Sequence, residues 1–257
     1  MKLLRSVAMA FSMFSRFPVP PVEWRKENMR YMLGFLPLVG ILLGALYALW
    51  WHIAVALSFG QFLFAAGLTA LPVLFTGGIH MDGFMDTVDA LASHAEPEKK
   101  RAILKDSRTG AFAVLYTVLY LLGTFALYTE AAEDISLCLP VCLIPVLSRS
   151  GSAVASLVFP VYGGEGLLKT FHDAGEKGAV LLPLGFAAAS LAVLALNAPA
   201  LSVVFLLTEG ICLFCVYRMS QKQFGGMSGD LAGFLLTVLE LGMLLILILY
   251  KAVNPCC

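Results

Sequence analysis

The sequence predicts an all-α, polytopic integral membrane protein with about seven transmembrane helices, short interfacial helices and one domain over residues 1–257. Of these residues, 60% are hydrophobic and only 13% are charged, and the mean hydropathy is +0.87. The apolar residues form runs long enough to cross a bilayer, with short polar segments between them. This composition excludes a soluble enzyme and requires a lipid bilayer as partner. The formal net charge is zero, so bulk charge indicates no nucleic-acid partner.

The N-terminal region predicts an interfacial helix, a connector and the first span. Residues 1–15 are apolar with their two basic residues set apart, which is typical of a helix lying at the membrane surface. The three prolines in 17–21 prevent a helix there, because proline has no backbone N–H to donate. Residues 31–57 are apolar over the length of a full span, and their glycines allow close packing against another helix.

Six further spans follow, each bounded by a turn or a polar segment. Gly77-Gly78 either ends the second span as a helix cap or lets the backbone approach a ligand. Pro97 opens a short amphipathic helix before the third span. Asn197-Ala198-Pro199 separates the fifth span from the sixth. The seven predicted spans cover residues 31–57, 62–76, 110–128, 135–158, 178–196, 201–217 and 231–250.

An acidic segment follows the second span. Asp82, Asp86 and Asp89 are separated by four and three residues, which places their side chains on one face of a helix. Like charges so close destabilise the helix unless a cation neutralises them, and no basic residue lies between them. Oxygen ligands in such a row suit Mg²⁺ best and Mn²⁺ second. The segment therefore predicts a magnesium site; the alternative is a polar interfacial helix whose acids face solvent.

The basic residues give the orientation. Alternating the seven spans across the bilayer places all of the 17 Lys and Arg residues except Lys251 on one side. The positive-inside rule makes this side the cytoplasm, with the N-terminus there and the chain in the cell (inner) membrane. The acidic segment, residues 105–108, Arg149 and the glycine-rich turn 225–230 then share one face. We therefore expect an active site at the cytoplasmic face, whereas a transporter would distribute its polar groups around the bilayer midplane.

A carboxylate-bound divalent ion with cations facing it is the usual apparatus of phosphoryl transfer. Lys105 and Arg108 would hold phosphates, and Asp106 between them would be a further metal ligand or a general base. The alternative for Asp106 is a helix cap or a local ion pair with its basic neighbours. His80 would be a base or a hydrogen-bond donor, or would only satisfy a local polar group. The turn that begins at Gly225 would offer backbone donors to a phosphate.

Together these residues resemble the cobalamin synthase family along nearly the whole chain. The matching motifs are FSRFPVP at 14–20, PLVGILLG at 37–44, TGGIHMDGFMDTVDAL at 76–91, KDSRTGAF at 105–112 and GGMSGDLAG at 225–233. Two positions depart from the family pattern: Ala90 stands where a glycine is expected, and Ser228 stands where threonine is usual. Neither departure removes a charged group, so only local backbone detail is affected.

The resemblance implies an adenosylcobinamide-GDP ribazoletransferase, a magnesium-dependent enzyme of the inner membrane. Such an enzyme joins adenosylcobinamide-GDP to α-ribazole or α-ribazole 5′-phosphate, gives adenosylcobalamin or its 5′-phosphate, and releases GMP. The resemblance implies metal ligands at Asp82, Asp86 and Asp89, with Asp106, Arg108 and Asp230 beside them. With the reasoning from the residues above, the predicted catalytic residues are Asp82, Asp86, Asp106 and His80. The substrate-binding residues are Lys105, Ser107, Arg108, Arg16, Arg149, Gly225, Gly226 and Asp230.

Two other functions are compatible with parts of the sequence, and a homo-oligomer is left open. A CDP-alcohol phosphotransferase-like enzyme also uses aspartates at a membrane surface, but its motif, which includes an Ala-Arg pair after an aspartate–glycine, is absent. A divalent-cation carrier would use the acids of 82–89 with Glu209 and Glu240 as a path, and would tolerate substitution of Lys105 and Arg108. Glu240 lies deep in the seventh span, so we expect it to pair with another helix.

Overall fold

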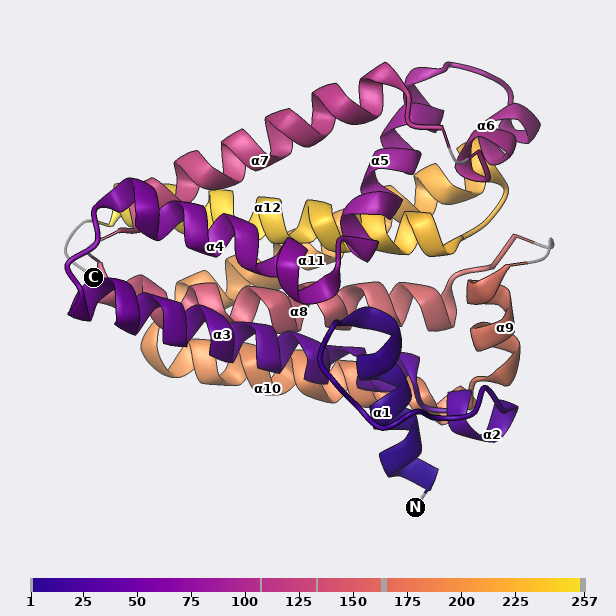
Figure 1. Cartoon of the computed structure of the whole chain (residues 1–257), viewed down its shortest axis with the longest axis horizontal. Helices are drawn as coiled ribbons and strands as arrows, with labels where there is room; N and C mark the ends of the chain where they lie inside the picture. Colours follow the sequence, from indigo (N-terminus) through magenta and orange to yellow (C-terminus); the bar gives the residue numbers. More distant parts are fainter. Residues whose placement is uncertain (1, 107, 133, 163–165, 255–257) are drawn as a thin grey trace.

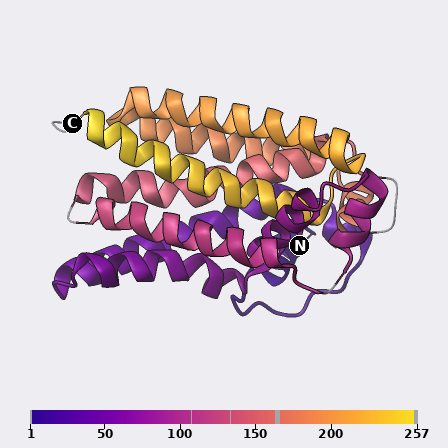
Figure 2. The ribbon, with the colours of Figure 1, turned by 90° about the horizontal axis from the view of Figure 1, so that it is seen from above.

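The computed structural model describes residues 2–106, 108–132, 134–162 and 166–254 (Figure 1). Every named element in these ranges is a helix, which confirms the predicted all-α class. The long helices run along the long axis of the molecule in both ribbon views (Figures 1 and 2). The helices are α1 Lys2–Phe14, α2 Lys26–Met29, α3 Leu36–Ala56, α4 Gln61–Thr76, α5 Ile79–Ala92, α6 Pro97–Leu104, α7 Ala111–Ala131, α8 Cys138–Val158, α9 Leu167–Ala174, α10 Leu181–Asn197, α11 Pro199–Met219 and α12 Gly229–Val253.

The spans agree with the sequence. In the part of the chain that the structure describes, six helices are long and apolar enough to cross a membrane, and the number is seven if the bent pair α4–α5 is counted as one span. The six are α7, α8, α10, α11, α12 and the helix that contains α3. The protein is therefore a multi-pass membrane protein, as its composition predicts.

The second span is broken, and the break positions the acidic segment. α4 ends at Thr76, and Gly77 and Gly78 have φ angles of 70° and 84°. Glycine adopts this left-handed conformation without a steric penalty, so the helix stops there and α5 leaves at 94° to α4. α5 consequently runs across the bundle rather than along it (Figure 1). Of the two predicted roles of Gly77-Gly78, this confirms the helix end.

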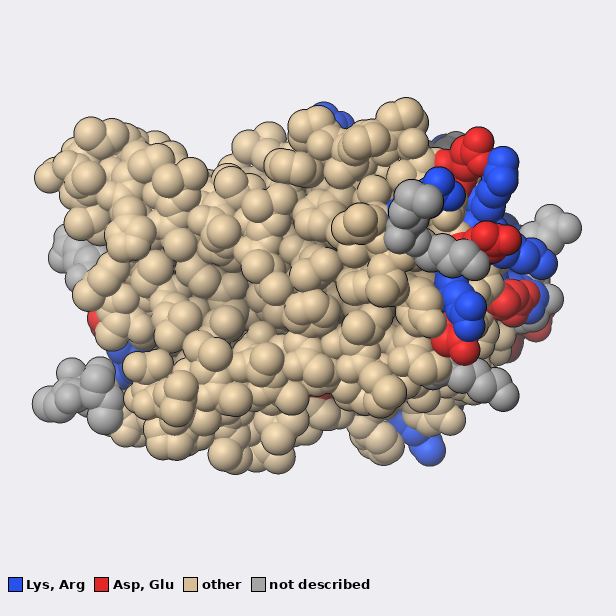
Figure 3. All heavy atoms as spheres, turned by 90° about the horizontal axis from the view of Figure 1, so that it is seen from below, with Lys and Arg blue, Asp and Glu red and all other residues tan. Residues whose placement is uncertain are grey.

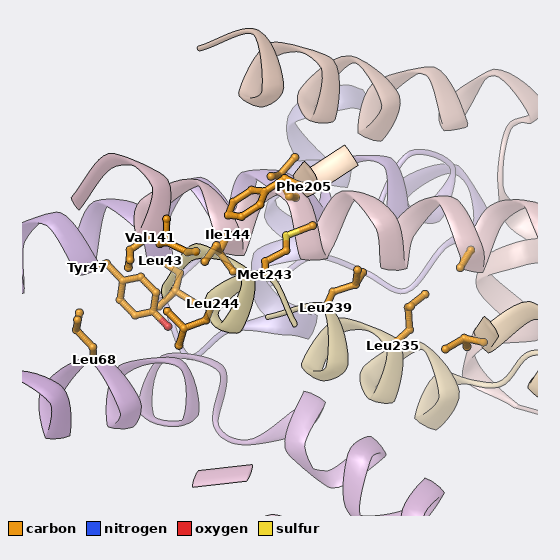
Figure 4. Packing of buried hydrophobic residues seen from close by; sticks show 14 of the residues in the cluster. Leu43, Tyr47, Leu68, Val141, Ile144, Phe205, Leu235, Leu239, Met243 and Leu244 are labelled. Atoms are coloured by element: carbon orange, nitrogen blue, oxygen red, sulfur yellow. The ribbon is translucent and has the colours of Figure 1, made fainter. Parts of the chain in front are cut away.

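α3 packs closely on α8 because it has glycines at the contact. A Cβ atom at Gly40 would lie 2.4 Å from the Pro145 carbonyl oxygen, and one at Gly44 would lie 2.3 Å from the Cys142 carbonyl oxygen. Neither contact leaves room for a side chain, which confirms the close packing predicted for these glycines. The buried side chains around this contact include Leu43, Tyr47, Val141, Ile144, Phe205, Leu239 and Met243 (Figure 4).

Charged side chains gather at one end of the molecule, and a wide band of uncharged side chains covers most of the remaining visible face (Figure 3). α2, α6 and α9 lie toward this polar end (Figure 1). Lys251 comes from the last turn of α12, near the opposite end. Its Nζ lies 3.3 Å from Asp134 Oδ2 and donates to the Glu130 carbonyl oxygen at 3.0 Å. The charge pattern is that of a membrane protein with one strongly polar face.

The N-terminal helix α1 docks one face on the bundle. Ser6, Met9 and Ala10 are buried, and Ser6 Oγ donates to the Asn28 carbonyl oxygen at 2.8 Å. On the other face, Leu4 is 74% exposed. An exposed apolar face beside a docked one suits a helix at the membrane surface.

Candidate active site

Four carboxylates come together at the polar end of the bundle. α5 carries Asp82, Asp86 and Asp89, and Asp230 lies in the first turn of α12. The two helices meet at Gly83, where a Cβ atom would lie 2.7 Å from the Asp230 carbonyl oxygen. Burial, followed by the charges of Asp82, Asp230 and Asp89, raises the pKa of Asp86 from 3.8 to about 6. The acidic face predicted for one helix is thus joined by a fourth carboxylate from the C-terminal part of the chain.

The chemistry of this donor set suits a hard divalent cation, because all four groups are carboxylates. Among the ion pairs of the described residues, none involves any of the four. Within the same residues, however, no three Asp, Glu, His or Cys side chains are arranged to hold a metal as they stand. Asp89 lies against the start of α7, where a Cβ atom at Gly110 would be 2.1 Å from Asp89 Oδ2. Metal binding therefore requires some of the carboxylates to rotate, and the magnesium site stays a prediction.

A cavity of about 460 Å³ opens beside the carboxylates. Asp82 and Asp230 form its acidic wall, whereas Asp86 and Asp89 do not line it. The cationic residues that line it are Arg101, Lys105 and Lys169. The apolar residues that line it include Met13, Phe14, Leu168, Phe171, Phe224 and Met227. The cavity can therefore receive a ligand that has both an anionic group and an apolar group.

The glycine-rich turn before α12 forms one wall of this cavity. Gly225 and Gly226 have φ angles of 76° and 152°. Met227 N donates to the Pro160 carbonyl oxygen at 2.8 Å, and Tyr162 N donates to the Met227 carbonyl oxygen at 3.2 Å. These hydrogen bonds hold the turn in place, and the turn lines the cavity from Gly226 onward. Gly225 itself does not line it.

Two cations of the cavity wall are not among the predicted site residues. The Arg101 guanidinium lies 4.3 Å from the centre of the Tyr162 ring, and its Nη1 donates to the Phe224 carbonyl oxygen at 2.9 Å. Lys169 comes from α9. Arg101 belongs to the basic run at 99–101, and this run could have identified it as a site residue. Nothing in the sequence around Lys169 marks that residue as part of the site.

Asp106 and Arg108 pair with each other away from the cavity lining. Arg108 Nη2 lies 2.7 Å from Asp106 Oδ2, and Arg108 Nε donates to Asp106 Oδ1 at 3.1 Å. The side-chain hydrogen bond from Arg108 lowers the pKa of Asp106. Of the alternatives for Asp106, the structure forms the local ion pair. Lys105 does line the cavity, and Ser107 lies outside the described residues.

Arg16 and His80 flank the bend between α4 and α5. The backbone N of Arg16 donates to the Phe75 carbonyl oxygen at 2.7 Å, and a Cβ atom at Gly77 would lie 2.6 Å from Arg16 Nε. Arg16 thus covers the bend and does not line the cavity. His80 lines the cavity and stacks on Phe14, with the ring centroids 6.0 Å apart. Among the described residues, its buried Nε2 has no hydrogen-bond partner.

The prediction that Arg149 lies at the cytoplasmic face with the other basic residues is wrong. Arg149 is fully buried in the middle of α8, and its Nη1 lies 2.6 Å from Glu240 Oε1 on α12. The same nitrogen donates to the Pro145 carbonyl oxygen at 3.1 Å. Arg149 does not line the large cavity. A buried charge needs a partner, and Glu240 provides one, which confirms that Glu240 pairs with another helix.

The family model described as cobalamin-5-phosphate synthase matches residues 6–248. An adenosylcobinamide-GDP ribazoletransferase of Lachnoclostridium phytofermentans is 37% identical over 242 residues, which cover 94% of this chain and 92% of the relative. Proteins of the same name from Clostridium perfringens and Desulfitobacterium hafniense are 31% and 34% identical, and each alignment covers 95% of this chain and 97% of the relative. No solved structure matches significantly. The chain therefore belongs to the cobalamin-5-phosphate synthase family.

Proposed function

We propose that this chain catalyses the adenosylcobinamide-GDP ribazoletransferase reaction with Mg²⁺, at the cytoplasmic face of the inner membrane and with its N-terminus in the cytoplasm. The activity follows from membership of the family. One observation supports the metal: four clustered carboxylates adjoin a cavity that also has cations in its wall. The gathering of charged side chains, Lys and Arg among them, at this end supports the orientation (Figure 3).

In this reaction a ribose hydroxyl of α-ribazole, or of its 5′-phosphate, attacks the phosphorus next to cobinamide. As the new P–O bond forms, the hydroxyl gives up its proton, the bond from this phosphorus to the bridging oxygen breaks, and GMP leaves with that oxygen. When bound, Mg²⁺ would neutralise part of the negative charge on the phosphate oxygens. Asp82, Asp86, Asp89 and Asp230 would hold the ion, and Lys105 would orient the pyrophosphate from the cavity wall.

The test is a GMP-release assay with the full-length protein in detergent or lipid. The protein is given adenosylcobinamide-GDP, α-ribazole 5′-phosphate and Mg²⁺, and we expect GMP and adenosylcobalamin 5′-phosphate in equal amounts. A chelator should stop the reaction, and added Mg²⁺ should restore it. Absence of GMP would contradict the proposed activity, whereas full activity in chelator would contradict only the role of the metal.

The Glu240–Arg149 ion pair argues against the divalent-cation carrier. A path through the bundle would need a carboxylate available to a passing cation at the depth of Glu240, and Arg149 already neutralises this group. Uptake of Mn²⁺ into proteoliposomes without any other substrate would be the result that favours a carrier. Release of CMP from a CDP-linked alcohol would favour the CDP-alcohol phosphotransferase.

Mg²⁺ should stabilise the protein more at pH 7.5 than at pH 5. The folded pKa of Asp86, about 6, lies above its ordinary value of 3.8. Protonation of Asp86 therefore favours the folded state, and this contribution is present below about pH 4 and is lost as the pH rises through about 6. At higher pH the ionised carboxylates repel one another, and a bound cation relieves the repulsion.

Thermal unfolding midpoints in detergent, with and without Mg²⁺ at both pH values, measure this effect. Replacing Asp86 by Asn is the control, and it should reduce the pH dependence of the Mg²⁺-induced shift. An equal shift at both pH values would show that the Asp86 carboxylate is not a ligand of the ion, and no shift at either pH would show that the cluster does not bind it.

A further inference from the structure

We propose that the cavity beside Asp82 and Asp230 is the binding site for α-ribazole, with the base in the apolar part and the 5′-phosphate at Lys169. The assignment rests on the proposed function and gives the two substrates separate binding sites. The corrinoid and the guanosine of adenosylcobinamide-GDP remain outside the cavity, and only their pyrophosphate reaches the acidic wall.

The size of the cavity fits one nucleoside-sized molecule. Its volume of about 460 Å³ lies in the lower half of the range of roughly 300–1,000 Å³ that is typical of small-molecule sites. Adenosylcobinamide-GDP combines a corrin ring with amide side chains, an adenosyl group and GDP, so it is much larger than α-ribazole. The cavity can therefore hold α-ribazole, or only one nucleotide part of the other substrate.

The apolar lining distinguishes between these two occupants. Leu168, Phe171 and Met227 are buried and contribute apolar wall. The Ser152 hydroxyl in the same wall already donates to the Ala232 carbonyl oxygen at 2.9 Å. Guanine has three polar groups on its pairing edge, and the side chains of Leu168, Phe171 and Met227 in this part of the wall offer them no polar partner. Dimethylbenzimidazole, which is the base of α-ribazole, has methyl groups on its edge and only one free ring nitrogen. The apolar lining therefore favours α-ribazole.

α9 adds a cation to the apolar wall. Lys169 lies between Leu168 and the next lining residue of α9, Phe171. Its Nζ pairs with Asp173 at 3.1 Å, but both side chains are partly exposed, so the pair is weak and a doubly charged phosphate can replace it. Lys105 follows α6 rather than belonging to α9, so it remains available to bind the pyrophosphate.

Replacing Lys169 by Gln tests the phosphate contact. We expect the KM for α-ribazole 5′-phosphate to rise about tenfold, as the loss of one charge-assisted hydrogen bond implies. The KM for unphosphorylated α-ribazole and the KM for adenosylcobinamide-GDP should not change. Lys99→Gln is the matched control, because Lys99 is exposed on α6 and does not line the cavity.

Replacing Ser156 by Leu tests the apolar part. Ser156 is buried in the cavity wall, and the larger side chain would occupy space that the base needs. The KM for both forms of α-ribazole should rise by more than about tenfold, with the KM for adenosylcobinamide-GDP unchanged. Ser190→Leu, a buried serine of α10 outside the cavity, is the control.

The outcomes separate this assignment from the proposed function. No GMP release by the wild type would overturn both. An active wild type whose variants raise the KM for adenosylcobinamide-GDP instead would overturn only the assignment and would place the guanosine in the cavity. Unchanged KM values in both variants would also overturn the assignment. If Ser156→Leu does not fold, as judged by its thermal unfolding, Lys169→Gln decides alone, because its side chain is partly exposed.

Discussion

Replacing Asp82 by Asn should lower the rate of GMP release about a thousandfold, because one missing metal ligand removes about 4 kcal/mol of transition-state stabilisation. Asp82 has two properties that the other carboxylates of α5 do not combine. It belongs to the four-carboxylate cluster, and it lines the cavity. Asn keeps the size and shape of the side chain, so the loss of charge is the main change.

Steady-state GMP release with saturating substrates measures the effect, and it should appear in kcat. Glu27→Gln is the matched control, because Glu27 is an exposed carboxylate of α2 outside the cavity. Asp230→Asn should resemble Asp82→Asn, since Asp230 lines the same wall. If Asp82→Asn keeps more than about a tenth of the wild-type rate, its carboxylate is not a ligand of a catalytic metal.

Replacing Arg149 by Met should destabilise the protein by about 3–5 kcal/mol, because it leaves the Glu240 carboxylate in the bundle without its partner. The guanidinium is fully buried and lies 2.6 Å from Glu240 Oε1. The double variant Arg149→Met with Glu240→Leu removes both charges and should recover most of the lost stability.

Unfolding in detergent with increasing denaturant compares the wild type with Arg149→Met, with Glu240→Leu and with the double variant. Arg218→Met, at the exposed end of α11, is the control and should be close to the wild type. If the Arg149→Met protein keeps the wild-type stability but binds its substrate at least about tenfold more weakly, Arg149 has the substrate-binding role that the sequence predicts.

The error at Arg149 shows where reasoning from the sequence reaches its limit. Alternation of spans assigns a polar residue to the nearer end of its helix, which for Arg149 is the cytoplasmic end. In the structure, its position is decided by Glu240, which is 91 positions away in the sequence. A local pattern of hydropathy contains no information about such a partner. The same holds for Lys169, whose place in the cavity wall depends on how α9 packs.

The amino-acid sequence alone determined the bilayer setting, the all-α class and the common helix face of Asp82, Asp86 and Asp89. Hydropathy and helical period are properties of neighbouring residues, so they can be read along the chain. The sequence also placed Asp230 on the same face of the membrane as these aspartates. Only the tertiary structure decided that Asp106 pairs with Arg108 and that a cavity opens beside the cluster. These features arise where α5 turns by 94° and meets α12. Contacts between distant segments depend on the packing of the whole bundle, and no single segment specifies them.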